Sequence, residues 1–139
     1  MIKELWFNLP VKNIQVSLQF YTSIGFTENT HFRKSETSAS LFAGSKNIVI
    51  MLFTEDVFVG YSRNPISSPL QSTQVLLSID AESREEVDLL ANTVTTSGGT
   101  VFAEPGDNQG WMYGSGFADP DGHRWTILYM DMSKMPGGG

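Results

Sequence analysis

The chain has 139 residues, of which 40% are hydrophobic and 17% are charged, and its net charge is −6. No apolar run reaches the roughly 18–20 residues that a membrane-spanning helix needs, and no secretory signal is recognisable at the N-terminus. The acidic balance disfavours nucleic acid as a partner, because nucleic acid carries dense negative charge. Since the chain has no cysteine, disulfides and thiolate zinc sites are excluded. We expect one compact cytoplasmic domain, or two very small halves that share a core.

The first part of the chain predicts a strand, a helix and three further strands. Apolar residues alternate along the first strand, and Asn13 is the expected N-cap of the helix, which ends at Gly25. A four-residue turn at 44–47 predicts a hairpin. The strands are expected at 5–11, 26–30, 38–43 and 47–53, and the helix at 14–24.

Residues 54–72 have the composition of a linker. They contain Gly60, Pro65, Pro69 and several serines, which are typical of irregular segments. One helical turn near 55–59, capped by Thr54, is the only regular structure expected there.

The same order of elements then returns. Ser83 and Glu86 form a capping box at the start of a second helix, which ends at the SGG sequence 97–99. The sequence DPDG at 119–122 is a strong turn signal between two strands. The strands of this second part are expected at 73–80, 100–103, 111–118 and 123–129.

This internal repeat predicts an α+β fold of two βαβββ modules, which form a curved mixed sheet around a cleft. The modules span 1–53 and 73–131, joined by the linker 54–72 and followed by a flexible tail at 132–139. The first strands align at an offset of 68 residues (Val11 with Ile79) and the hairpins at 75 (Phe42 with Phe117).

Two segments resemble the vicinal oxygen chelate superfamily, which includes glyoxalase I, extradiol dioxygenases and bleomycin and fosfomycin resistance proteins. NLPVKNIQVSLQFYTSIGF, at 8–26, is similar to the opening strand and helix of that family. GFADPDGHRWTILYMD, at 116–131, is similar to its final hairpin. The resemblance covers about residues 3–131, which is nearly the whole chain.

In metal-dependent members, the resemblance implies, His, Glu or Gln side chains on the first and last strands of each module hold a divalent ion. The positions that correspond here are Trp6, Met51, Gln74 and Thr126. Tryptophan has no lone pair for a metal, methionine is too soft for a hard ion, and threonine is a weak neutral ligand. Because Gln74 alone cannot hold an ion, we expect no metal or other cofactor.

A small-molecule pocket is predicted instead, since aromatic residues and methionine with a few amides and hydroxyls are typical of such sites. Glu104 and Asp107 offer carboxylates near it, but a solvated loop is the simpler interpretation. Neither His31 nor His123 has a second acid at ligand spacing. The candidate pocket residues are Trp6, Asn8, Met51, Gln74, Trp111, Tyr113 and Thr126.

Two functions remain open, beside the simpler possibility of a dimeric scaffold whose pocket is vestigial. The first is metal-free binding of a small aromatic or cationic molecule, as in bleomycin-resistance-like sequestration. The second is a metal-dependent enzyme similar to lactoylglutathione lyase or an extradiol dioxygenase, which requires a divalent ion. The resemblance also implies a homodimer, and neither nucleic acid nor a membrane is expected as a partner.

Overall fold

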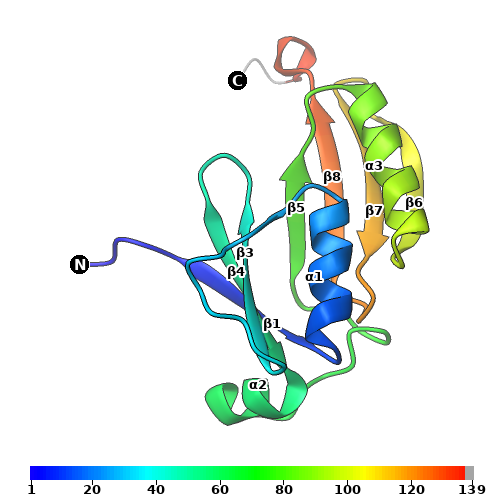
Figure 1. The fold of residues 1–139 in the computed structure, drawn as a ribbon. Coiled ribbons are helices and arrows are strands. Elements are labelled where there is room, and N and C mark those ends of the chain that lie inside the picture. The colour runs from blue at the N-terminus through cyan, green and yellow to red at the C-terminus, as the bar shows by residue number, and fades with distance from the viewer. Residues whose placement is uncertain (137–139) are drawn as a thin grey trace. The chain divides into compact units, whose positions relative to one another are not determined.

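The structure is a computed structural model that describes residues 1–136 (Figure 1). The chain divides into two compact units, unit 1 from Met1 to Ser68 and unit 2 from Pro69 onward. Each unit contains one four-stranded mixed sheet. The predicted α+β class with two βαβββ modules is therefore confirmed. The tail predicted at 132–139 contains a short 3₁₀ turn, Met132–Lys134, and its last three residues lie outside the described part.

Unit 1 has the strand order β1-β4-β3-β2. Strand β1 runs parallel to β4, and β3 runs antiparallel to both β2 and β4. Its elements are β1 (Trp6–Val11), α1 (Ile14–Ser23), β2 (Thr27–Glu28), β3 (Ser38–Ala43), β4 (Ile48–Thr54) and α2 (Glu55–Ser62).

Helix α1 begins and ends as the sequence predicts. The side chain of Asn13 accepts a hydrogen bond of 3.1 Å from the backbone N–H of Val16, which satisfies one of the free donors of the first turn. Gly25 follows the helix at a φ of 112°, a conformation that costs other residues more than glycine. The helix packs against β3 and β4 and buries Ile14, Leu18 and Tyr21.

The strand register divides the residues of this sheet between two faces. Phe7 lies opposite Ile50 and Leu9 opposite Leu52, and Ile50 and Leu52 belong to the buried core. Since side chains alternate along a strand, Asn8 and its neighbour Met51 point to the other face. That second face of the sheet, which we call the open face of unit 1, also carries Trp6 and Phe53.

The predicted linker contains more structure than one helical turn. Helix α2 has eight residues, and Figure 1 shows it at the ends of β1 and β4. Glu55 and Asp56 lie in its first turn, where acidic side chains favour the helix dipole, and Arg63 ends it at a φ of 56°. None of its residues is fully buried, which explains why its sequence pattern is weak.

Unit 2 repeats this architecture with the strand order β5-β8-β7-β6. Strand β5 runs parallel to β8, and β7 runs antiparallel to β6 and β8. The side chain of Ser83 accepts a hydrogen bond of 3.1 Å from the N–H of Glu86, as expected of a capped helix. The elements are β5 (Leu76–Asp80), α3 (Arg84–Thr96), β6 (Thr100–Asn108), β7 (Met112–Ala118) and β8 (Arg124–Met130).

Strand β6 is longer than predicted. The sequence analysis ends it at Ala103 because Pro105 and Gly106 follow, and it interprets 104–107 as a loop. In the structure β6 continues to Asn108, with two register shifts against β7. Proline is tolerated there because β6 is an edge strand, where an N–H can be missing without a lost ladder bond.

The two units align at a different offset from the one predicted for their first strands. The N-caps Asn13 and Ser83 lie 70 residues apart. The same offset relates Phe7, which pairs with the buried Ile50, to Leu77, which pairs with the buried Trp125. Two agreeing markers therefore replace the predicted offset of 68.

None of the helices within residues 1–136 combines the length and the apolar character needed to cross a membrane.

Glycine substitutions provide a test of this packing. A Cβ at Gly114 would lie 2.8 Å from the backbone oxygen of Ile127, whereas a Cβ at Gly60 would meet nothing within 4 Å. We expect Gly114→Ala to destabilise the protein by about 1–3 kcal/mol through overpacking. Gly60→Ala, inside helix α2, is expected to stabilise it by about 0.5–1 kcal/mol. Urea unfolding measures both, and equal effects of the two variants would contradict the described packing.

Candidate ligand-binding site

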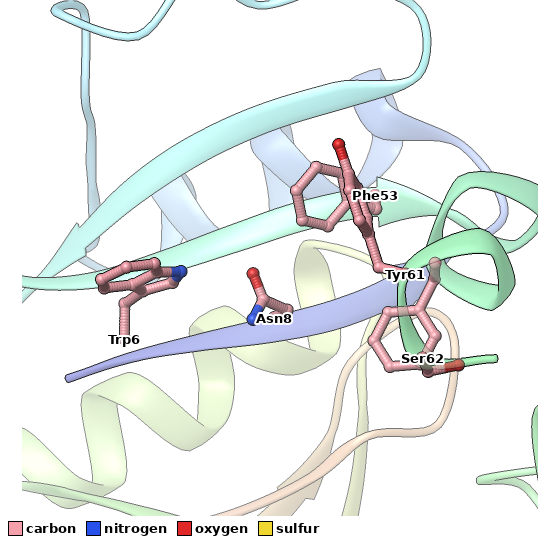
Figure 2. Close-up of a pocket in the computed structure, with 6 residues that line it drawn as sticks. Trp6, Asn8, Phe53, Tyr61 and Ser62 are labelled. Atoms are coloured by element: carbon pink, nitrogen blue, oxygen red, sulfur yellow. The ribbon is translucent and has the colours of Figure 1, made fainter. Parts of the chain in front are cut away.

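The open face of unit 1 contains a pocket between the sheet and helix α2 (Figure 2). Its volume of about 480 Å³ lies within the range of small-molecule sites. Four of its lining residues are aromatic and two are polar. They are Trp6, Asn8, Phe53, Phe58, Tyr61 and Ser62.

Local structure explains why these side chains meet. Trp6 and Asn8 are two residues apart on β1, so they project from the same face of the sheet. Phe58 and Tyr61 are three residues apart on α2 and therefore lie on neighbouring positions of one helix face. The rings of Phe53 and Tyr61 are in contact, with centroids 5.2 Å apart and planes inclined at 56°. This contact joins the helix to the sheet.

The pocket is mainly apolar, and its two polar lining residues, Asn8 and Ser62, offer hydrogen-bonding groups. All six lining residues are uncharged. In Figure 2 the amide of Asn8 points into the space between Trp6 and the aromatic rings near α2. The amide can both donate and accept, and the hydroxyl of Ser62 offers a second polar contact. Such a lining suits a flat ligand with aromatic or cationic character.

The structure brings together two of the predicted pocket residues, Trp6 and Asn8, in this pocket. Met51 lies beside Asn8 in the strand ladder and points to the same open face. It is only 9% exposed, and it is not a lining residue of the pocket. The sequence analysis missed the contribution of α2, because it treated 54–72 as a linker. The signal available there was the spacing of Phe58 and Tyr61 within a segment already expected to begin a helix.

The predicted residues of unit 2 do not lie together. Thr126 is on β8 and its hydroxyl is 2.6 Å from that of Ser78 on β5. Gln74 precedes β5 and is exposed. At the observed offset of 70 residues, Leu76 is the counterpart of Trp6, and Ser78 is the counterpart of Asn8. A ligand contact of Gln74 stays a prediction.

Tyr113 lies on the opposite face of its sheet from Thr126. It alternates with the buried residues Ser115 and Phe117, whereas Thr126 pairs with Gly116. Its hydroxyl donates a hydrogen bond of 2.7 Å to Asp88 on α3, which raises the pKa of the phenol. Burial and the charge of Asp88 contribute to the same shift. Tyr113 therefore connects β7 to α3.

Trp111 and the carboxylates near it do not line one common pocket either. Trp111 is half-buried, and its indole N–H has no hydrogen-bond partner within the described residues. Asp107 forms an ion pair of 2.7 Å with Arg84, whose guanidinium carbon lies 4.9 Å from the centre of the Tyr113 ring. Glu104 lines a separate, polar hollow beside α3.

The donor chemistry at the positions implied by the resemblance does not fit a divalent ion. Trp6 offers only an indole, Met51 a largely buried thioether, and the hydroxyl of Thr126 is shared with Ser78. In the observed register, the residue of unit 2 that corresponds to Trp6 is Leu76 and not Gln74. The set of family positions therefore contains no amide. Across residues 1–136, no three His, Asp or Glu side chains cluster so that they could hold a metal.

Comparison with known proteins gives one family. The sequence model described as "Glyoxalase/Bleomycin resistance protein/Dioxygenase superfamily" matches residues 5–127. No curated protein matches the chain.

Solved structures share this fold. A hypothetical protein from S. aureus is 33% identical, with 93% of this chain and 94% of that chain covered and a TM-score of 0.81. A glyoxalase/bleomycin resistance protein/dioxygenase family enzyme from Burkholderia phytofirmans is 20% identical, with 92% and 99% covered and a TM-score of 0.77. The fosfomycin resistance protein FosX from Listeria monocytogenes, complexed with Mn(II) and sulfate, is 18% identical, with 96% and 95% covered and a TM-score of 0.68.

The hydrogen bond of Tyr113 predicts a pH effect. Because the pKa of the phenol is raised in the folded protein, the bond stabilises the fold below the usual tyrosine pKa near 10, and this stabilisation is lost as the pH rises through the folded value. Absorbance titration at 295 nm should contain a component with a raised pKa that Tyr113 contributes. It should disappear in Tyr113→Phe and move down in Asp88→Asn. A titration that Asp88→Asn leaves unchanged would contradict this assignment.

Proposed function

The chain belongs to the Glyoxalase/Bleomycin resistance protein/Dioxygenase superfamily, and we propose that this member binds a small aromatic or cationic molecule without a protein-held metal. In this proposal it sequesters the ligand, as the name of the bleomycin resistance proteins suggests, and does not transform it.

The pocket on the open face of unit 1 carries the proposal. Its four aromatic side chains come from β1, β4 and α2, so the sheet and the helix both contribute faces of rings. Aromatic faces attract quaternary ammonium and other soft cations, by about 0.5–2 kcal/mol for each good contact. They also stack with flat aromatic ligands.

Charge supports the cationic part of the proposal. The chain carries a net charge of −6, and Glu55 and Asp56 lie on the helix that supplies Phe58 and Tyr61. An acidic protein attracts cations at long range and accelerates their binding at low salt. The pocket itself has no charged lining residue, so a bound cation would be held there by the aromatic faces and the polar groups of Asn8 and Ser62.

The metal-dependent alternative, a lyase or dioxygenase, is less well supported. Such an enzyme uses a divalent ion to stabilise negative charge on the oxygens of its substrate. Trp6, Met51 and Thr126 occupy the positions that the resemblance assigns to its ligands, and they do not supply suitable donors.

The proposal includes a homodimer located in the cytoplasm. The resemblance motivates the dimer, because members of this superfamily often build their clefts from two chains. Strands β1 and β5 are edge strands, and exposed apolar residues such as Leu5 and Val75 lie next to them in the sequence. An edge with apolar neighbours is suited to pairing with a second chain.

Ligand binding is tested with benzyltrimethylammonium, which combines an aromatic ring with a quaternary cation. We expect it to raise the melting temperature and to change tryptophan fluorescence, since Trp6 is 52% exposed while Trp125 is buried. Trp6→Ala should weaken binding by about 1–2 kcal/mol, or roughly five- to thirtyfold in Kd. Leu89→Ala removes an exposed apolar side chain of α3 that does not line the pocket, and it should leave Kd unchanged.

Neutral benzyl alcohol separates the contributions of ring and charge. Weaker binding than that of benzyltrimethylammonium supports a site for aromatic cations, and equal binding supports a site for aromatic ligands in general. Equal affinity of the wild type and Trp6→Ala for both compounds would reject the pocket as the site.

Metal content distinguishes the two functions. Protein purified without chelators should contain less than about 0.2 metal ions per chain, because the donors at the family positions bind hard ions poorly. EDTA should leave the binding of benzyltrimethylammonium unchanged. Stoichiometric metal, or lyase activity that appears on addition of Ni²⁺, Zn²⁺ or Fe²⁺, would support the enzyme instead.

The homodimer predicts a mass in solution of twice 15.4 kDa. Size-exclusion chromatography with light scattering measures it directly. A mass of 15.4 kDa across the micromolar range would reject this part of the proposal and leave the pocket in unit 1 unaffected.

A further inference from the structure

The sheet of unit 2 also has an open face, and its surface differs from that of unit 1. Thr126 and Arg124 alternate with the buried Trp125, so both project from the face opposite the core. Gly116 lies directly opposite Thr126 on β7. Because glycine has no side chain, this part of the sheet can accept a group that lies flat on the backbone.

The ring of Phe102 occupies that space. A Cβ at Gly116 would lie 2.5 Å from Cε1 of Phe102, so the ring rests on the glycine backbone. Phe102 is nevertheless 40% exposed, which is high for so large an apolar side chain. The part of the ring that stays exposed is available to a partner.

Arg124 provides a positive charge on this ring. Its guanidinium carbon lies 4.2 Å from the centre of the Phe102 ring. The contact restrains a long side chain, which reduces the entropy that a ligand contact would otherwise have to remove. Within unit 2 up to Pro136, Arg124 forms no ion pair, so its N–H groups keep their capacity to bind an anion.

Two hydroxyls lie on the same face. Ser78 and Thr126 are 2.6 Å apart, and either can be the donor. One proton serves the bond between them, so the second hydroxyl proton is free to be donated to a ligand. Arg124 and Thr126 are two residues apart on β8, which places their backbones about 7 Å apart along the strand.

From this arrangement we infer that the open face of unit 2 binds an oxyanion, a carboxylate or a phosphonate, attached to a small aromatic ligand. Arg124 binds the anion, the hydroxyl pair donates a further hydrogen bond, and the exposed part of the Phe102 ring packs against the apolar part of the ligand. A guanidinium matches both oxygens of such a group at once. Asp80, farther along β5 on the same face as Ser78, repels anions and confines the site to the Arg124 end.

This inference is independent of the proposed function. The pocket of unit 1 has uncharged lining and is proposed for aromatic or cationic ligands, whereas the face of unit 2 carries an unpaired cation. Either site can exist without the other, and each has its own probe.

Benzoate and phenylphosphonate are the two anionic probes, and benzamide is the uncharged control of the same shape. Two-dimensional ¹H–¹⁵N spectra follow the backbone amides of β8 and the side-chain Nε–H of Arg124. We expect shifts at Arg124 and Thr126 with the anions and none with benzamide. Arg124→Met should raise Kd at least about tenfold, because charged hydrogen bonds are lost. Arg124→Lys should give an intermediate value, since lysine keeps the charge but not the paired donors.

Three variants control for folding and for charge. Phe102→Leu should weaken binding of both probes while Arg124 is retained, and Asp80→Asn should leave binding equal or tighter. The two-dimensional spectrum of Arg124→Met should keep the wild-type positions of amides far from residue 124, which shows that the variant is folded. Tighter benzoate binding than phenylphosphonate binding assigns the site to carboxylates, and the reverse assigns it to phosphonates. Benzoate binding that is unchanged in Arg124→Met, or matched by benzamide, would overturn the inference.

Discussion

A single helix covers only one face of a four-stranded sheet, and this constraint governs both units of the chain. Helix α1 covers one face of the sheet in unit 1, and α3 packs against β6, β7 and β8 in unit 2. The side chains that point away from each helix stay uncovered unless another segment packs on them or a ligand binds them. Since alternation along a strand fixes their direction, the strand registers decide which side chains are available to a ligand.

The two units use their open faces differently. In unit 1 the linker folds into α2 and adds Phe58 and Tyr61 to the aromatic residues of the sheet, which produces a pocket. In unit 2, Gly116 on β7 has no side chain, so the ring of Phe102 from the edge strand rests on its backbone. Arg124 lies against that ring. The same order of elements thus carries an uncharged aromatic surface in one unit and a cationic surface in the other.

Sequence alone predicts the features that depend on neighbouring residues. The cap at Asn13, the cap at Ser83 and the DPDG turn are local, because short side chains bond to backbone a few residues away. The alternation of β1 likewise places Trp6 and Asn8 on one face. The full length of helix α2 was not predicted, because the helix buries no residue completely and its sequence therefore lacks a strong helical period. The offset between the first strands of the units was predicted wrongly, because the apolar alternation of β5 fits alignments that differ by two residues equally well. Only the pairing of β5 with β8 distinguishes these alignments.

That two-residue shift sharpens the argument about metal chemistry. A strand keeps its faces when it shifts by two residues, so the counterpart of Trp6 still points from the open face, but it is Leu76 and not Gln74. Each unit then offers one apolar residue on its first strand and Met51 or Thr126 on its last. Two hard-ion ligands in each unit would have to be restored together, because a single carboxylate among apolar neighbours lacks the partners that hold a divalent ion. In our proposals, the aromatic pocket of unit 1 and the Arg124 face of unit 2 use these same surfaces for recognition that needs no ion.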